Sequence, residues 1–182
     1  NANLINKAVE QFKTTASLGG GRNLYEANHE VYNLLRYGVK IKPGIGEQTE
    51  TVWLVDWQNP KANHFVVAEE VSIKGEHNKR PDVVLYVNGL ALGVIELKRS
   101  KVAVSEGIRQ NIGNQKKDFI RPFFSTVQLV MAGNDVEGLR YGVIDTQEKY
   151  WLEWKESGDE PNPLDRSLLQ MCSKGRLLEL VH

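Results

Sequence analysis

Residues 81–98 read PDVVLYVNGLALGVIELK and predict a β-hairpin. Two apolar runs flank Asn88-Gly89, a residue pair that strongly favours a two-residue hairpin turn. Neither run alternates apolar with polar residues, so we expect other parts of the chain to cover both faces of the hairpin. The hairpin nevertheless contains three charged side chains, which are Asp82, Glu96 and Lys98.

These charges have two interpretations, because an unpaired charge inside a buried strand is costly. In the first, the hairpin lies at a sheet edge and its charges pair across a face that is open to water. In the second, Asp82 and Glu96 share a face and bind a hard cation such as Mg²⁺, with the backbone carbonyl of Leu97 as a further ligand. Lys98 lies on the strand face of Glu96, where it would orient or deprotonate a water that attacks a phosphate.

The register of the hairpin tests the metal-site interpretation. A regular two-residue turn pairs Asp82 with Ile95 and directs Glu96 to the opposite face. A three-residue turn over residues 87–89, or a β-bulge, shifts the parity and brings the two carboxylates to one face. The metal-site interpretation therefore predicts an odd-length turn or a bulge in this hairpin.

The rest of the chain predicts a mixed α/β domain. The glycines at residues 19–21 predict a break, and residues 150–154 fit either a strand or a helix. An amphipathic stretch covers residues 4–12, and we expect helices over about 24–37, 102–119 and 164–180 and strands over 52–57, 65–73, 127–131 and 141–144.

Composition excludes several classes of protein. The 182 residues contain 23 Lys and Arg and 23 Asp and Glu, a balance that argues against binding nucleic acid by bulk charge. Residues 74–121, however, contain ten basic and five acidic residues, so a basic stretch brackets the candidate site. The single cysteine, Cys172, cannot form an internal disulfide, and no apolar run has the length of a membrane span. We expect a cytoplasmic protein that has no membrane partner.

The segments 80–90 and 93–98 together resemble the N-terminal nuclease domain of the R (restriction, or motor) subunit of type I restriction enzymes. That domain belongs to the PD-(D/E)xK nuclease superfamily. The resemblance implies a restriction-endonuclease-like mixed β-sheet flanked by helices. It also implies Asp82 and Glu96 as metal ligands, Lys98 as the catalytic lysine, and one or two Mg²⁺ ions for hydrolysis of DNA phosphodiester bonds.

The resemblance further implies an endonuclease domain over residues 1–160 and a C-terminal helical segment over residues 161–182. That segment would lead toward motor domains of the same polypeptide, and ATP would act only through those domains, since this chain has no Walker-type loop. Double-stranded DNA is the implied substrate, and methyltransferase and specificity subunits are the implied partners. Two alternatives stay open: a junction-resolvase or repair nuclease of the same superfamily, and a catalytically silent DNA-binding or docking module.

Two helices carry further candidate residues. Glu30 flanks the apolar stripe of the first, where many superfamily members have an acidic residue that reaches the metal; a solvent-exposed glutamate is the alternative. Gln110 matches the first residue of the Gln-x-x-x-Tyr pattern of related domains, and Asn114 replaces the tyrosine. The residues expected to contact DNA or support the site are Gln110, Arg80, Arg99 and Lys101.

Overall fold

The computed structural model describes residues 2–182 and shows a six-stranded sheet at the centre of the fold. The strands lie in the order β3-β4-β5-β6-β7-β8; β5 and β6 run parallel, and the other neighbouring pairs are antiparallel. Their bounds are β3 (Phe65–Glu69), β4 (Val83–Val87), β5 (Leu90–Leu97), β6 (Leu129–Asn134), β7 (Gly138–Gly142) and β8 (Leu152–Glu153).

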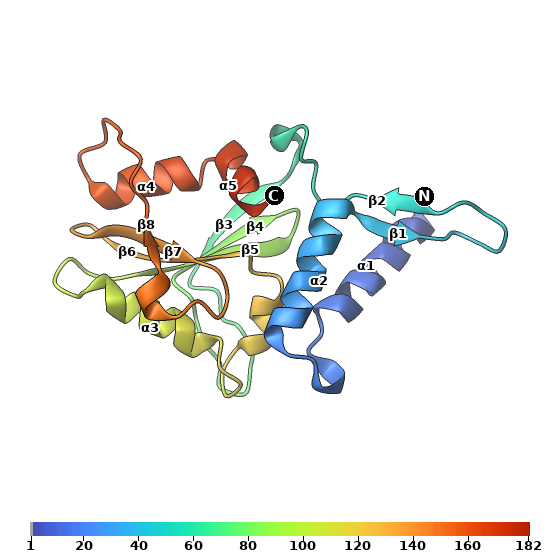
Figure 1. Ribbon diagram of the computed structural model, residues 1–182, viewed down its shortest axis with the longest axis horizontal. Coiled ribbons are helices and arrows are strands. Elements are labelled where there is room, and N and C mark those ends of the chain that lie inside the picture. Colours follow the sequence, from blue (N-terminus) through green and yellow to red (C-terminus); the bar gives the residue numbers. More distant parts are fainter. Residues whose placement is uncertain (1) are drawn as a thin grey trace.

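Helices flank this mixed sheet, which confirms the predicted fold class (Figure 1). Helix α3 (Val104–Asn114) connects the parallel strands and lies on one face, whereas α4 (Pro163–Met171) and α5 (Lys174–Val181) lie on the other (Figure 1). At one end stand α1 (Ala2–Ala16), α2 (Leu24–Tyr37) and a small sheet of β1 (Val39–Ile41) and β2 (Glu50–Val52). Short 3-10 helices span Gly19–Gly21, Pro60–Ala62, Arg121–Ser125 and Glu148–Tyr150.

The hydrophobic core forms a layer on each face of the sheet. Leu92 and Ile95 of β5 pack in the layer under α4 and α5, and Val94 packs in the layer under α3. Residues 91–96 are buried without interruption, as expected for a central strand that is covered on both faces. Among residues 2–182, no helix has the length and apolar character needed to cross a membrane.

Several predicted boundaries are wrong for local reasons. The strand expected over residues 52–57 ends at Val52. The segment that follows is irregular, and its Trp57 indole donates to the Leu35 carbonyl of α2 at 3.0 Å. The strand expected over residues 65–73 ends at Glu69, because Glu70 adopts a left-handed backbone conformation with φ 51°.

Two predicted helices are also too long. The helix expected over residues 102–119 covers Val104–Asn114, after Ala103 in an extended conformation. The helix expected over residues 164–180 is interrupted after Met171, because Ser173 is extended and α5 begins at the next residue.

Candidate active site

The β4–β5 hairpin combines a two-residue turn with a β-bulge. Both residues of the turn at Asn88-Gly89 have positive φ, 50° and 81°, as a tight hairpin of this length requires. The register then shifts by one residue between the pair Tyr86–Ala91 and the pair Leu85–Gly93. Leu92 is the extra residue on β5, and it packs into the core layer under α4 and α5.

The bulge places both carboxylates on one face. Beyond it Val83 pairs with Ile95, so the next position along the register sets Asp82 beside Glu96. In a regular hairpin with this turn, Asp82 would instead have met Ile95. The predicted bulge is therefore confirmed, and it produces the parity that a shared carboxylate site requires.

The two carboxylates differ in environment. Asp82 is half-buried, and its Oδ2 accepts a hydrogen bond from the backbone N–H of Leu97 at 2.7 Å. Glu96 is completely buried. Burial raises the pKa of Glu96 to about 8; the Asp82 charge also raises it, and the Lys98 charge lowers it. A buried carboxyl next to a second carboxylate is an arrangement that favours the arrival of a positive charge.

Amide side chains of α3 hold Glu96 and Lys98 in place. Gln110 donates from Nε2 to Glu96 Oε2 at 2.6 Å and accepts at Oε1 from Lys98 Nζ at 2.7 Å. Asn114, one helical turn later, donates from Nδ2 to Glu96 Oε1 at 3.1 Å. Lys98 Nζ also donates to the Leu97 carbonyl at 3.3 Å. Gln110 thus bridges the buried carboxylate and the lysine.

Helix α3 can carry these amides because it lies close to the sheet. A Cβ on Gly107 would lie 3.1 Å from Ala132 Cβ of β6, and 3.4 Å from both the Glu96 carbonyl oxygen and Lys98 Cγ. The buried Asn111 donates from Nδ2 to the Met131 carbonyl at 3.3 Å, which fixes the rotation of the helix on the sheet. The absence of a side chain at residue 107 therefore allows the short reach of Gln110 and Asn114.

The structure does not bring Glu30 to this cluster. Its carboxylate pairs with Arg22 at 2.6 Å, and the neighbouring Asn28 donates to the carbonyls of Phe124, Ser125 and Val127 before β6. Because β6 runs parallel to β5, that contact lies at the strand end opposite to Glu96. Within residues 2–182, no group of three His, Cys, Asp or Glu side chains is close enough to hold one metal ion.

Three of the four residues predicted to contact DNA or support the site lie on loops beside the cluster, and the fourth, Gln110, lies on α3. Arg80, just before β4, is exposed and pairs with Glu70 at 3.3 Å. Arg99 and Lys101 are exposed on the loop between β5 and α3, and neither forms an ion pair with another residue of the described chain. Gln110 is the member of this predicted set that contacts the carboxylate and the lysine directly.

Sequence reasoning missed the role of Asn114. The resemblance led us to expect a tyrosine at this position, yet Asn114 is buried and holds the second oxygen of Glu96. The available signal was its spacing, since an amide four residues after Gln110 lies on the same face of a helix.

The whole constellation lies within a recognised sequence family. The family model described as Type I restriction enzyme R protein N terminus (HSDR_N) matches residues 1–149. The chain belongs to this family. The R-protein N terminus therefore forms part of a type I restriction enzyme endonuclease subunit.

Similar proteins cover most of this R-protein segment. The endonuclease subunit of the type I restriction enzyme HindI from Haemophilus influenzae is 29% identical over 160 residues, which cover 85% of this chain and 15% of that protein. The corresponding SsaAORF53P subunit of Staphylococcus saprophyticus is 24% identical over 176 residues, 93% of this chain and 18% of that protein. The chain thus spans less than a fifth of either relative. A cryo-electron microscopy structure of a DrdV–DNA complex aligns at a TM-score of 0.36 and 16% identity, over 98% of this chain and 13% of that chain.

Proposed function

We propose that this R-protein N terminus is the Mg²⁺-dependent nuclease domain of its subunit and hydrolyses phosphodiester bonds of double-stranded DNA. The observation that carries the proposal is the bulged hairpin, which sets Asp82 beside Glu96, together with Gln110, which links Glu96 to Lys98. Family membership supports the same reaction class.

The donor set fits a hard divalent cation. Asp82 and Glu96 offer carboxylate oxygens, and the Leu97 carbonyl, already within reach of an ammonium group, adds a neutral oxygen. The pKa of Glu96 stays raised although the Lys98 charge lowers it, so one lysine does not offset the burial of Glu96 and the charge of Asp82. Mg²⁺ held by these oxygens would supply Lewis-acid stabilisation of the negative charge on the phosphate.

The protein's own groups position the reactants. Lys98 carries a positive charge beside the carboxylates, and its hydrogen bond to Gln110 limits the directions in which the ammonium group can point. From that position Lys98 would hold the attacking water and stabilise charge that develops on the phosphate. Gln110 and Asn114 would keep Glu96 oriented toward the cation.

The proposal also includes other domains of the polypeptide and other subunits of the complex. Motor domains of the same polypeptide would use ATP to bring DNA to this site, and methyltransferase and specificity subunits would complete the complex. Arg80, Arg99 and Lys101 would contact DNA near the site. Because α2 holds Glu30 away from the carboxylates, we do not assign that residue a metal.

Cleavage of DNA by the full-length protein in its complex tests the proposal. Asp82→Asn and Lys98→Met should each abolish Mg²⁺-dependent cleavage while leaving ATP hydrolysis intact. Asp159→Asn and Lys155→Met, exposed residues distant in sequence from the site, are the matched controls and should cleave at the parental rate. Unchanged cleavage by the first two variants would exclude this site, and an inactive parental complex with active ATP hydrolysis would favour a docking module.

A further inference from the structure

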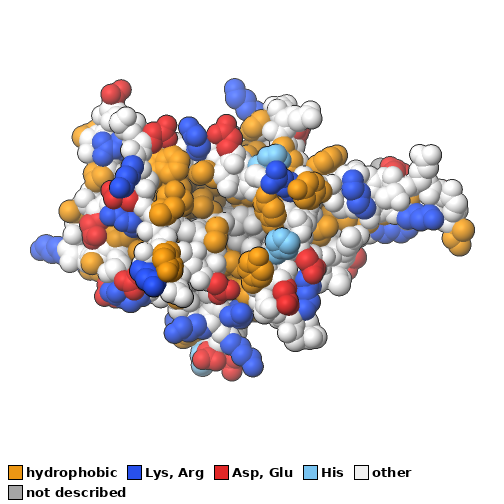
Figure 2. Space-filling view, viewed as in Figure 1, with side chains coloured by type: hydrophobic (Ala, Val, Ile, Leu, Met, Phe, Trp, Pro, Cys, Tyr) orange, Lys and Arg blue, Asp and Glu red, His pale blue; other side chains and the backbone are white. Residues whose placement is uncertain are grey.

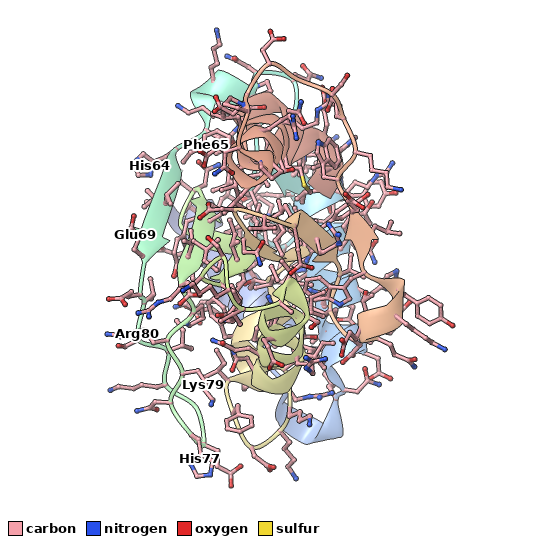
Figure 3. All side chains as sticks on the ribbon, turned by 90° about the vertical axis from the view of Figure 1, so that its left-hand side faces the viewer. His64, Phe65, Glu69, His77, Lys79 and Arg80 are labelled. Carbon is pink, nitrogen blue, oxygen red and sulfur yellow. The ribbon has the colours of Figure 1, made fainter. Side chains whose placement is uncertain are left out.

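Two loops extend from the candidate site and contact each other. Residues 72–80 lead into β4 and Asp82, and residues 115–121 follow Asn114 at the end of α3. We call these two segments the tip loops. Figure 3 shows Arg80, Lys79 and His77 along the first of them, leading away from the end of β3 at Glu69.

Backbone hydrogen bonds and close packing join the tip loops into one unit. Ile73 and Lys79 exchange backbone hydrogen bonds of 2.8 and 3.1 Å, which close the first loop. The His77 N–H donates to the Asp118 carbonyl at 3.1 Å and ties that loop to the second. A Cβ on Gly75 would lie 2.3 Å from the Phe119 carbonyl oxygen, so a glycine is required where the loops meet. Charged side chains on these loops are therefore presented on a fixed backbone.

The unit formed by the tip loops is basic. Residues 72–80 and 115–121 contain six Lys or Arg and two acidic residues. Lys74, Lys116 and Lys117 are exposed, and none of the three is in an ion pair within the described chain. The Lys79 ammonium lies 4.1 Å from the centre of the Phe119 ring and forms no ion pair with another residue of the described chain. Figure 2 shows several Lys and Arg side chains at the lower end of the molecule, with Asp and Glu side chains among them.

We propose that the tip loops bind the phosphate backbone of the DNA duplex whose scissile phosphate lies at Asp82 and Glu96. The inference rests on the proposed function, and it adds a contact between the tip loops and DNA to the contact at the candidate site. Lys79 is three residues from Asp82, and Lys116 is two from Asn114, so their Cα atoms lie within about 11 and 7 Å of those residues even if the chain is fully extended. Phosphates follow one another about every 3.4 Å of axis along one strand, so the tip loops lie within a few phosphates of the site.

A duplex fits this surface because its charge is continuous. Exposed lysines without acidic partners bind a regular row of phosphates by releasing counterions, and need no base-specific contact. A preformed loop pair also lowers the entropic cost of holding those lysines against the backbone. The tip loops would hold the duplex in line with the site and leave the choice of sequence to other parts of the complex.

Site-specific photo-crosslinking in the full-length complex tests this contact. Lys117→Cys, labelled with an azidophenacyl group, should crosslink to DNA, and the crosslinked peptide can be identified by mass spectrometry. Burial raises the pKa of Cys172 to about 11, so that thiol should label slowly. Lys155→Cys is the control for an exposed lysine outside the tip loops and should not crosslink.

A lysine-removal variant measures the same contact by its salt dependence. One variant combines Lys74→Ala, Lys116→Ala and Lys117→Ala. At limiting DNA, its plot of log cleavage rate against log salt should have a negative slope that is smaller in magnitude by about 3. The control combination Lys42→Ala, Lys61→Ala and Lys155→Ala removes the same charge from exposed positions elsewhere and should leave the slope unchanged.

The outcomes separate this inference from the proposed function. Cleavage that depends on Asp82, with no DNA crosslink at residue 117 and no change in slope, would overturn the tip-loop contact and leave the nuclease assignment intact. A crosslink from residue 117 to protein in place of DNA would also overturn it. Cleavage that persists in Asp82→Asn would overturn the nuclease assignment on which the inference rests.

Discussion

Glu96 has a buried carboxyl group whose environment disfavours its charged form. Burial and the neighbouring Asp82 raise the pKa of Glu96 to about 8 in the folded chain, against an ordinary value of 4.5. Below pH 4.5 the group is protonated in both the folded and the unfolded chain. Between pH 4.5 and 8 the unfolded chain loses this proton and the folded chain keeps it, so the free energy of unfolding falls as pH rises.

Glu96→Gln should remove this pH-dependent loss of stability. In metal-free buffer, the variant should unfold with a free energy at least about 1 kcal/mol above that of the parental chain at pH 8, and close to the parental value at pH 4.5. Urea titrations at the two pH values measure the difference. If the variant gained the same free energy of unfolding at pH 4.5 and at pH 8, ionisation of Glu96 would not be the cause.

Mg²⁺ binding should depend on pH for the same reason. At the proposed site a cation would require Glu96 in its charged form, so binding would release the proton that the folded chain retains below pH 8. We expect apparent Mg²⁺ affinity to rise about tenfold per pH unit between pH 6 and 8 and to level off above that range. Calorimetry in buffers of different ionisation enthalpy measures the released proton, and Glu96→Gln should abolish the release.

Gln110 and Asn114 contact the same carboxylate but should have different effects. Asn114→Ala removes a hydrogen bond that lowers the pKa of Glu96, so the acidic limb of the pH–rate profile for cleavage should move to higher pH. Gln110→Ala also releases Lys98 and should lower the maximal cleavage rate by about 10–100-fold. Identical profiles for the two variants would contradict these separate roles.

At the scale of elements, the close packing of α3 on the sheet controls the site. Gly107→Val would place side-chain atoms against Ala132 and Lys98, push the helix outward and separate Gln110 from Glu96. We expect a loss of about 1–3 kcal/mol of stability and a loss of cleavage that is larger than this loss of stability explains. Gly113→Ala in the same helix meets nothing within 4 Å and should stabilise the chain by up to about 1 kcal/mol without affecting cleavage.

The sequence predicted some elements well because local chemistry specifies them. Helix α2 matches its predicted bounds of 24–37, since Asn23 and Glu26 form a capping box and Gly38 ends the helix. The hairpin is equally local, because Asn88-Gly89 specifies the turn. The bulge followed from requiring two carboxylates on one face, but the position of its extra residue, Leu92, depends on core packing that no local pattern records.

Other features depended on contacts between distant segments. The run 52–57 has the composition of a strand, yet it packs against α2 and has no strand partner beyond Val52. From the sequence, Asn114 was only a replacement for an expected tyrosine. Its hydrogen bond to Glu96 depends on the packing of α3 over β5, which the sequence does not show. For Glu30 the sequence left two alternatives, a metal ligand or a solvent-exposed glutamate, and the place of α2 at the other end of the sheet decides for the second.

At the scale of the whole molecule, the last two helices belong to the main core. Met171 of α4 and Leu178 of α5 are buried in the layer that also contains Ile95 and Leu92 of β5. Met171→Ala and Leu178→Ala should each cost about 2–5 kcal/mol, whereas Leu180→Ala, at a side chain that is 37% exposed, should cost far less. Chemical denaturation checks this, and equal costs at all three positions would contradict the packing. The prediction of a separate segment over residues 161–182 stays a prediction about where motor domains would begin.

The extra residue at Leu92 also affects how related sites should be searched for. Between Asp82 and Glu96 lie the five residues of β4, the two-residue turn and the first six residues of β5, one of which is the bulge residue Leu92. A relative with a straight second strand and the same turn would present its glutamate to the same aspartate one residue earlier. A search pattern with a fixed gap between the two acids would overlook such a protein, whereas one that permits a single-residue gap in mid-strand would retain it.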